Sequence, residues 1–358
     1  MNSSSFKKFY SGKRVLVTGH SGFKGSWLCR WLEHLGSEVY GISLSPNTKP
    51  SHFEALYKNG RENDYWADVR QKELVDDIFL KNNPEIVFHL AAQPSVLESY
   101  RNPLETIETN ILGSANILNS ACKNPSTKVV VIITTDKCYE NKEWIFPYRE
   151  NDELGGHDIY SSSKACVELI TKAWQKSFLR KDNKKISIAS ARAGNVIGGG
   201  DWTEDRLVVD LVKSRYTGKK LHIRYPESTR PWQHVLDPLC GYLQLAMYLS
   251  KNKNLIGAYN FGPDNASNLT TIELINLFAD LDKRYSEGLE VEKPRFHEAS
   301  HLMVDSSKAK VNLEWSPVFK INEAVQLTKD WYSNYYNKNH ILTDKQIELY
   351  MNRISHVY

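Results

Sequence analysis

Tyr160 and Lys164 form the residue pair whose types and spacing most directly suggest chemistry. Residues four apart share one face of a helix, so the ammonium of Lys164 can stand beside the phenol of Tyr160. A nearby positive charge favours the phenolate, and we expect it to lower the pKa of the tyrosine from about 10. Such a tyrosine can take the proton of a substrate hydroxyl while a hydride leaves the same carbon for a bound acceptor.

A second set of reactive residues, Thr135, Asp136 and Lys137, follows an apolar run. Ligands meet the carboxyl ends of parallel strands, so Thr135 is placed to hydrogen-bond the reacting hydroxyl. Asp136 and Lys137 add an acid and a base beside it. Plain hydride transfer does not need that extra pair, which suggests a second proton-transfer step such as elimination of water. Charge alone fits a salt pair on a surface loop equally well.

Three glycines between an apolar run and an amphipathic segment predict a phosphate-binding loop. Gly19 allows a tight turn, Gly22 lets the backbone approach a pyrophosphate, and Gly25 lets the helix pack closely on the strand. The spacing is G-x-x-G-x-x-G rather than the common G-x-G-x-x-G. The pattern indicates a nicotinamide dinucleotide held by Gly19, Ser21, Gly22, Phe23, Lys24 and Gly25.

The second strand does not decide between NAD and NADP. An acid at its end would bind the adenosine ribose, but the corresponding residue is Ser43, with neither an acid nor an arginine beside it. Lys24 inside the loop could favour a 2′-phosphate. Asp68 and Val69 follow the third strand and could bind the adenine edge, although an ordinary surface turn explains them equally well.

Alternating apolar and amphipathic segments predict a doubly wound parallel α/β sheet of the Rossmann type, with a second, smaller α/β substrate domain. The alternation ends near residue 193. We expect residues 1–193 plus about 234–262 to form the dinucleotide domain, and about 194–233 and 263–358 to form the substrate domain. Strands are expected at 14–18, 38–44, 85–90, 128–135 and 185–191, and helices at 23–35, 71–81, 104–122 and 159–179.

The composition is that of a small-molecule enzyme. Of the 358 residues, 41% are hydrophobic and 25% are charged, with a formal net charge of +4, which does not favour a nucleic-acid surface. The five cysteines are scattered and odd in number, so we expect reduced thiols, with neither a disulfide framework nor a metal site. With no signal peptide and no apolar span of membrane length, the expected location is cytoplasmic, away from membranes.

These motifs together resemble the extended short-chain dehydrogenase/reductase family over nearly the whole chain. The glycine loop, the Tyr160–Lys164 pair, the segment His89-Leu90-Ala91-Ala92-Gln93 and Asn110 carry the resemblance. It implies that Leu90, Ala91, Ala92 and Asn110 join Ser43, Asp68, Val69, Tyr160 and Lys164 in holding the cofactor.

Within that family the chain resembles the nucleotide-sugar 4,6-dehydratases, whose motif is threonine-aspartate-glutamate. Lys137 stands where they have glutamate. With this lysine the chain resembles the branch of the family that acts on CDP-glucose, which supplies CDP-linked dideoxy sugars for bacterial lipopolysaccharide. The resemblance implies that Tyr160 removes the C4 hydroxyl proton, Lys137 removes the C5 proton and Asp136 protonates the leaving hydroxyl. The cofactor ends as it began, so NAD is expected to stay bound, with NADP left open.

The resemblance also implies substrate contacts and a partner. The candidate contacts are Gln93, Arg192, Asn195, Arg206, Arg224, Arg230 and His301. Helices 104–122 and 159–179 would pair across a homodimer as a four-helix bundle, or within a tetramer built from it. A 4-epimerase, a dehydratase for another nucleotide sugar, a reductase that releases its cofactor and a dinucleotide sensor remain as alternatives.

Overall fold

A seven-stranded parallel sheet forms the centre of the computed structural model, which describes residues 3–178, 186–292 and 299–357. The strand order is β11-β6-β5-β4-β1-β2-β3, and every neighbouring pair is parallel. This confirms the predicted doubly wound α/β fold. The strands are β1 (Arg14–Thr18), β2 (Glu38–Ser43), β3 (Asp64–Trp66), β4 (Ile86–His89), β5 (Val129–Ile133), β6 (Ser187–Ala193) and β11 (Gly257–Phe261).

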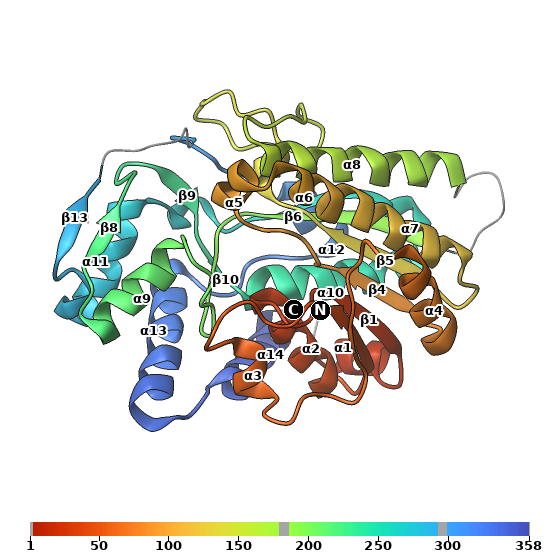
Figure 1. Ribbon diagram of the computed structural model, residues 1–358, viewed down its shortest axis with the longest axis horizontal. Coiled ribbons are helices and arrows are strands. Elements are labelled where there is room, and N and C mark those ends of the chain that lie inside the picture. The colour runs from red at the N-terminus through yellow and green to blue at the C-terminus, as the bar shows by residue number, and fades with distance from the viewer. Residues whose placement is uncertain (1–2, 179–185, 293–298, 358) are drawn as a thin grey trace.

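Helices connect the strands and cover both faces of the sheet (Figure 1). The helix after β1 starts at Phe23, directly after Gly22, and ends before Gly36, whose φ of 82° lies in the left-handed region that favours glycine. The helices of the sheet region are α1 (Ser3–Tyr10), α2 (Phe23–His34), α3 (His52–Leu56), α4 (Lys72–Asn82), α5 (Val96–Arg101), α6 (Pro103–Ile107), α7 (Gly113–Lys123), α8 (Ile159–Phe178), α10 (Leu236–Lys251), α12 (Ser307–Leu313) and α14 (Thr343–Val357).

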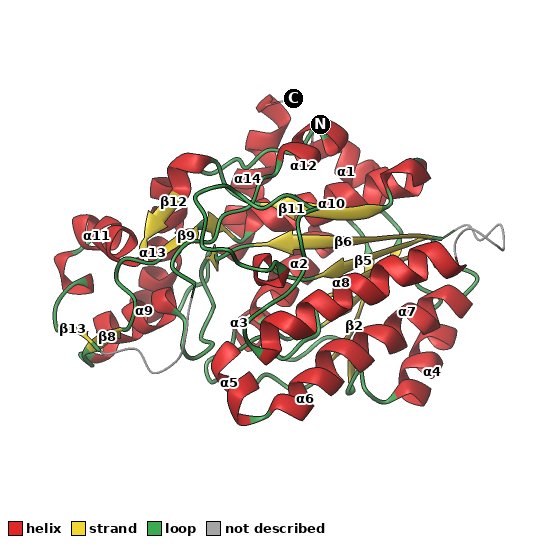
Figure 2. Ribbon diagram, turned by 90° about the horizontal axis from the view of Figure 1, so that it is seen from above, coloured by secondary structure: helices red, strands yellow, loops and turns green. Residues whose placement is uncertain are grey.

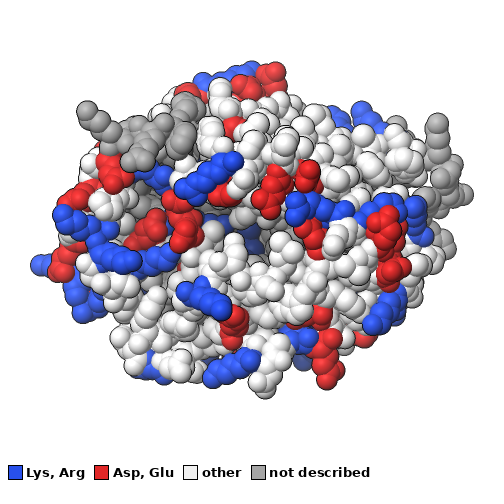
Figure 3. Space-filling model, viewed as in Figure 1, with Lys and Arg blue, Asp and Glu red and all other residues white. Residues whose placement is uncertain are grey.

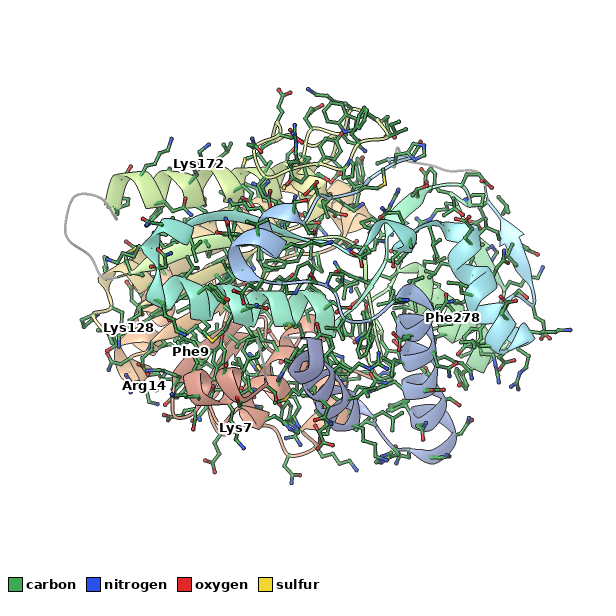
Figure 4. The ribbon with its side chains drawn as sticks, turned by 180° about the vertical axis from the view of Figure 1, so that it is seen from behind. Lys7, Phe9, Arg14, Lys128, Lys172 and Phe278 are labelled. Atoms are coloured by element: carbon green, nitrogen blue, oxygen red, sulfur yellow. The ribbon has the colours of Figure 1, made fainter. Side chains whose placement is uncertain are left out.

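Two hydrophobic cores lie on opposite faces of the sheet, because successive side chains of a strand point to opposite sides. In β1, Val15 and Val17 pack in the core under α2 and α10, whereas Leu16 packs in the core under α4, α7 and α8. Figure 2 shows α4, α7 and α8 side by side on one face, and Figure 4 shows the teal helix α10 crossing the other. The continuous apolar runs of β1 and β5 follow from this two-sided burial.

The remaining elements gather at one end of the sheet, on the left of Figure 1. They comprise α9 (Leu207–Thr217), α11 (Thr271–Leu281), α13 (Ile321–Lys338) and three short strand pairs: β7 (Val196–Ile197) with β10 (Gln233–His234), β8 (Leu221–Ile223) with β13 (Leu289–Val291), and β9 (Thr229–Pro231) with β12 (Asn268–Thr270). Segment 234–262 contributes α10 and β11 to the sheet region. The domain limits given above stay a prediction.

Two expected elements differ from those observed. The helix expected over 104–122 is interrupted by a π-helical segment, Glu108–Leu112, which carries Asn110 inward to Ser163. The strand expected at 185–191 runs over Ser187–Ala193 instead, so Arg192 belongs to it. Leu179 and Lys185 lie outside the described residues. Within the described ranges, every helix is too short or too polar to cross a membrane.

A buried ion pair joins α8 to β6. Arg192 Nη2 lies 2.8 Å from Glu168 Oε2, and each side chain is 3% exposed. Glu168 also accepts hydrogen bonds from Thr134 and Ser190. Burial raises the pKa of Glu168, but Arg192 and these hydroxyls hold that pKa below its ordinary value. The helix that carries Tyr160 is therefore fixed to the sheet by charge as well as by packing.

We expect Glu168→Gln to lower the free energy of unfolding by about 3–5 kcal/mol, because the change leaves Arg192 charged without its partner in the interior. Urea denaturation followed by circular dichroism measures the loss. Glu153→Gln is the matched control, since Glu153 pairs with Lys142 at 3.0 Å on the surface and should contribute less than about 1 kcal/mol. Equal unfolding midpoints for the two variants would show that the buried pair does not stabilise the fold.

Candidate active site

A cavity of about 1100 Å³ opens at the carboxyl end of the sheet, where β5 and β6 meet the smaller end of the molecule. The sheet region contributes the residues of the glycine loop, of the turn after β5 and of the first turn of α8. The other side comes from α9, β8 and β9. Of the residues expected in the site, the cavity is lined by Phe23, Lys24, Thr135, Asp136, Lys137, Tyr160, Asn195, Arg206, Arg224 and Arg230.

The glycine loop is shaped by two close approaches. Gly19 has φ 71°, and a Cβ there would lie 2.8 Å from the backbone nitrogen of Ala91. A Cβ at Gly25 would lie 2.0 Å from Gly19 O, so both positions require glycine. At Gly22 a Cβ would meet only Gly19 O, at 3.4 Å, which leaves the space above the start of α2 open. That arrangement fits a pyrophosphate on a helix N-terminus.

The end of β2 presents hydroxyl groups. Ser21 Oγ lies 2.7 Å from Ser43 Oγ and 2.8 Å from Leu44 O. Nearby, Asp68 accepts a hydrogen bond from Arg70 Nη2 at 2.6 Å, while Val69 is buried. A neutral hydroxyl pair can hydrogen-bond a ribose but offers no charge to balance a 2′-phosphate.

A hydrogen-bond chain ties the segment after β4 to the Tyr160 helix. Asn110 accepts from the backbone nitrogen of Gln93 at 2.8 Å and donates to Ser163 Oγ at 2.8 Å. The side chain of Gln93 is occupied with Ser95 O and Thr106 Oγ1 and does not line the cavity. Gln93 therefore shapes this segment instead of reaching the substrate, which corrects the expectation for it.

The turn after β5 brings the second reactive set to the cavity. Asp136–Cys138 form a 3₁₀ turn that begins at Thr135, whose Oγ1 accepts from the backbone nitrogen of Lys137 at 3.3 Å and donates to Asp136 Oδ1 at 3.0 Å. Asp136 Oδ2 is buried and has no hydrogen-bond partner within the described part of the chain. A Cβ at position 194 would lie 2.9 Å from this oxygen, so Gly194 keeps the space beside it open.

Burial shifts the pKa values of the reactive groups toward their uncharged forms. It raises the pKa of Asp136, against the lowering effect of Lys137, Thr135, Arg230 and Lys24. Burial and, to a smaller extent, the charge of Lys24 together lower the pKa of Lys164 to about 8. A raised carboxyl pKa and a lowered amine pKa both move these groups toward the range that general acid–base catalysis uses near neutral pH.

The tyrosine–lysine pair differs from the expectation. Burial raises the pKa of Tyr160 to about 12, while a hydrogen bond with Thr135 lowers it. Lys164 Nζ donates to Ile133 O at 3.3 Å and is not among the charges that act on the phenol. The predicted lowering of the tyrosine pKa by Lys164 is thus wrong, because removal of the phenol from water raises its pKa.

Two further candidates, Arg192 and His301, do not line the cavity. Arg192 is buried against Glu168, and its Nη1 donates to Tyr139 Oη at 2.7 Å, so it supports β6 and does not reach the cavity. His301 lies outside the cavity lining, in a bridge with Thr229. Both positions correct the expectation of a substrate contact.

Three of the arginines expected to contact the substrate line the cavity, and they come from the smaller end. Arg206 Nη1 lies 2.6 Å from Asp201 Oδ2, and Arg224 Nη2 lies 3.8 Å from Asp205 Oδ1. Arg230 is buried beside Asp136, whose pKa it lowers. Sequence reasoning missed Asp201, although it follows directly on a run of glycines, and it missed Asp210 of α9, for which no local pattern gave a signal.

Known proteins share this architecture. A CDP-glucose 4,6-dehydratase of Salmonella typhimurium is 42% identical over 330 residues, which cover 91% of this chain and 92% of the relative. A dTDP-glucose 4,6-dehydratase of Haemophilus influenzae is 27% identical over 341 residues, covering 89% and 97%. The structure of UDP-glucose 4-epimerase with UDP-glucose from Thermotoga maritima superposes with a TM-score of 0.78 at 26% identity, covering 90% of this chain and 99% of the epimerase.

A family model agrees with these relatives and with the resemblance inferred from the motifs. It is described as GDP-mannose 4,6 dehydratase, and it matches residues 16–328, from β1 into the first half of α13. The matched span includes the glycine loop, the turn after β5, the Tyr160 helix and the arginines of the cavity. The chain belongs to the GDP-mannose 4,6 dehydratase family.

Proposed function

We propose that the protein is an NAD-dependent hydro-lyase that converts CDP-glucose to CDP-4-keto-6-deoxyglucose and water. The observation that carries the proposal is the placement of Asp136 and Lys137 in the same cavity as Tyr160. A 4-epimerase would need the tyrosine and its lysine but has no use for an additional acid and base. The 42% identity to a CDP-glucose 4,6-dehydratase supports the same substrate.

The cofactor would be held by the open space over Gly22 and the start of α2, with Ser21 and Ser43 at the ribose end. Bound NAD would accept a hydride from C4 of the sugar, return it to C6, and add a positive charge that favours the phenolate of Tyr160. Because the cofactor is regenerated in each turnover, it can remain bound.

The residues of the cavity would move the protons. Tyr160 takes the proton of the C4 hydroxyl, and Thr135 hydrogen-bonds the same oxygen. The 4-ketone acidifies C5–H, which Lys137 removes. Asp136, whose pKa is raised by burial, gives a proton to the departing C6 hydroxyl. Arg206, Arg224 and Arg230 are placed to hold the diphosphate.

We also propose a homodimer formed through α6, the π-helical segment and α8. Leu104 is 71% exposed, Leu112 is 50% exposed and Leu169 is 54% exposed. These residues lie on neighbouring helices, which run side by side along the edge shown at the top of Figure 1. A group of large apolar side chains in water is typical of a protein interface.

The reaction is tested by incubating the purified protein with CDP-glucose and no added cofactor. Proton NMR should show CDP-4-keto-6-deoxyglucose. CDP-galactose as the product would indicate an epimerase, and unchanged substrate would contradict the proposal.

We expect Lys137→Ala to oxidise C4 normally but to slow exchange of the C5 hydrogen with deuterated water by about 10²–10⁴-fold, because the base is lost. Absorbance of the reduced cofactor follows the first step, and NMR follows the exchange. Lys142→Ala, which removes an exposed lysine of the same loop, is the control. Normal exchange at C5 in Lys137→Ala would refute the role of this lysine.

Asp136→Asn should separate removal of the C5 proton from departure of the C6 hydroxyl. The amide has no acidic proton to give, so we expect exchange at C5 to continue while formation of the 6-deoxy product falls by about 10²-fold or more. The measured quantity is the ratio of exchange to product formation. An equal loss of both would place Asp136 in the C5 step.

Leu169→Glu should convert the dimer to monomers, because a buried unpaired carboxylate at the interface is costly. Sedimentation velocity measures the mass. Val311→Glu, at a 78% exposed position on α12, is the control. A Leu169→Glu protein that stays dimeric would place the interface elsewhere.

A further inference from the structure

The cavity has two ends with different charged neighbours. At the catalytic end, Arg206 acts on the pKa values of both Lys24 and Tyr160, and Asp136 acts on the same two groups. Asp210 also lines the cavity, but the charges that act on its pKa come from Lys213, Asp205, Arg224 and Glu204. Asp210 lies on α9, which packs against β8 and lines the cavity from the smaller end of the molecule.

This side of the cavity is partly apolar. Leu207 and Val208 come from the first turn of α9, and Ile223 and Tyr225 come from β8 and the residues after it. The two elements pack together at the left of Figure 1. Apolar and aromatic side chains such as these suit a planar base better than a sugar.

Asp210 is a carboxylate that lines the cavity beside these apolar and aromatic side chains. It is half-buried in the first turn of α9, and its backbone nitrogen donates to Arg206 O at 2.9 Å. No hydrogen bond or ion pair to its carboxylate is found in residues 3–178, 186–292 and 299–357. Burial raises the pKa of this carboxyl to about 6, which Lys213 and Arg224 only partly offset. A half-buried carboxylate without a partner inside a binding cavity is available to a ligand.

We propose that Asp210 selects the base of the nucleotide sugar by accepting a hydrogen bond from the exocyclic amino group of cytosine. An ionised carboxylate only accepts hydrogen bonds. Cytosine presents an amino donor at C4, whereas uracil and thymine present a carbonyl acceptor at the same position, which a carboxylate repels. The inference rests on the proposed function for the identity of the nucleotide, and it names the residue that distinguishes CDP-sugars from UDP- and dTDP-sugars.

The surroundings of Asp210 are consistent with recognition of a neutral donor. Arg224, the nearest arginine at this end, is engaged with Asp205 at 3.8 Å. Charged residues of both signs line this side of the cavity, among them Glu204, Asp205 and Arg224. Figure 3 shows acidic and basic side chains intermingled on the outer surface at the left of the molecule as well. The selectivity must then come from a directed hydrogen bond.

A simpler role for Asp210 is stabilisation of the N-terminus of α9 by its negative charge. That role would affect folding and would not discriminate between pyrimidines. The ratio of two affinities separates the explanations, because a general change in the cavity alters both affinities together.

The test compares binding of CDP and of UDP by isothermal titration calorimetry. We expect the native protein to bind CDP at least tenfold more tightly than UDP. In Asp210→Asn the amide can donate as well as accept, so the ratio should fall about tenfold or more. Asp210→Leu, which pairs with neither base, should lose the preference as well, and it keeps the test valid if one variant folds poorly. Glu204→Gln, a neighbouring exposed carboxylate of the cavity, should leave the ratio unchanged.

Each outcome is decisive. Equal weakening of CDP and UDP in both Asp210 variants, or a native protein without preference for CDP, would overturn the inference. A fall in the ratio that Glu204→Gln shares would assign the effect to general charge and would also overturn it. Because the measurement uses nucleotides and no turnover, a preserved CDP preference with no dehydration of CDP-glucose would reject the proposed function while leaving the role of Asp210 in place.

Discussion

The removal of the reactive side chains from water is the constraint on which the proposed chemistry depends. Asp136 is 1% exposed, Lys164 is 6% exposed and Tyr160 is 8% exposed. Each is therefore shifted toward its uncharged form. On the surface an aspartate would have lost its proton well below neutral pH and could not protonate a leaving hydroxyl. The same burial makes the phenol of Tyr160 a poor base until a positive charge enters the cavity.

Such burial is tolerated because the surrounding structure is rigidly connected. The parallel register of β5 and β6 brings the turn after β5 next to the end of β6. The Glu168–Arg192 pair then fixes α8 against β6 from behind the site. Asn110, in its π-helical segment, fixes the start of α8 to the segment after β4. These contacts hold Tyr160 and Asp136 at one cavity.

Much of the sheet could be predicted from sequence because its signals are local. Apolar runs, glycines at turns and residues four apart on a helix are visible without knowledge of the fold. The buried ion pair of Arg192 was not predictable in this way, because its partner Glu168 is 24 positions earlier in the chain and no local pattern indicates the pair. Asp210 was missed for the same reason: α9 has apolar residues around much of its circumference, so the sequence does not tell which face meets the cavity. The shift of the Tyr160 pKa could not be foreseen either, since spacing says nothing about desolvation.

Lys24 shows how position resolves a question that residue type leaves open. A lysine in the first turn of a helix opposes the helix dipole, and burial lowers its pKa to about 8, so its placement costs stability. Its electrostatic neighbours are Arg206, Asp136 and Asp201, all at the catalytic end. A side chain directed there does not serve a 2′-phosphate at the end of β2, where Ser21 and Ser43 offer only neutral hydroxyls. Lys24 is therefore no argument for NADP, and the hydroxyl pair matches the unphosphorylated ribose of NAD.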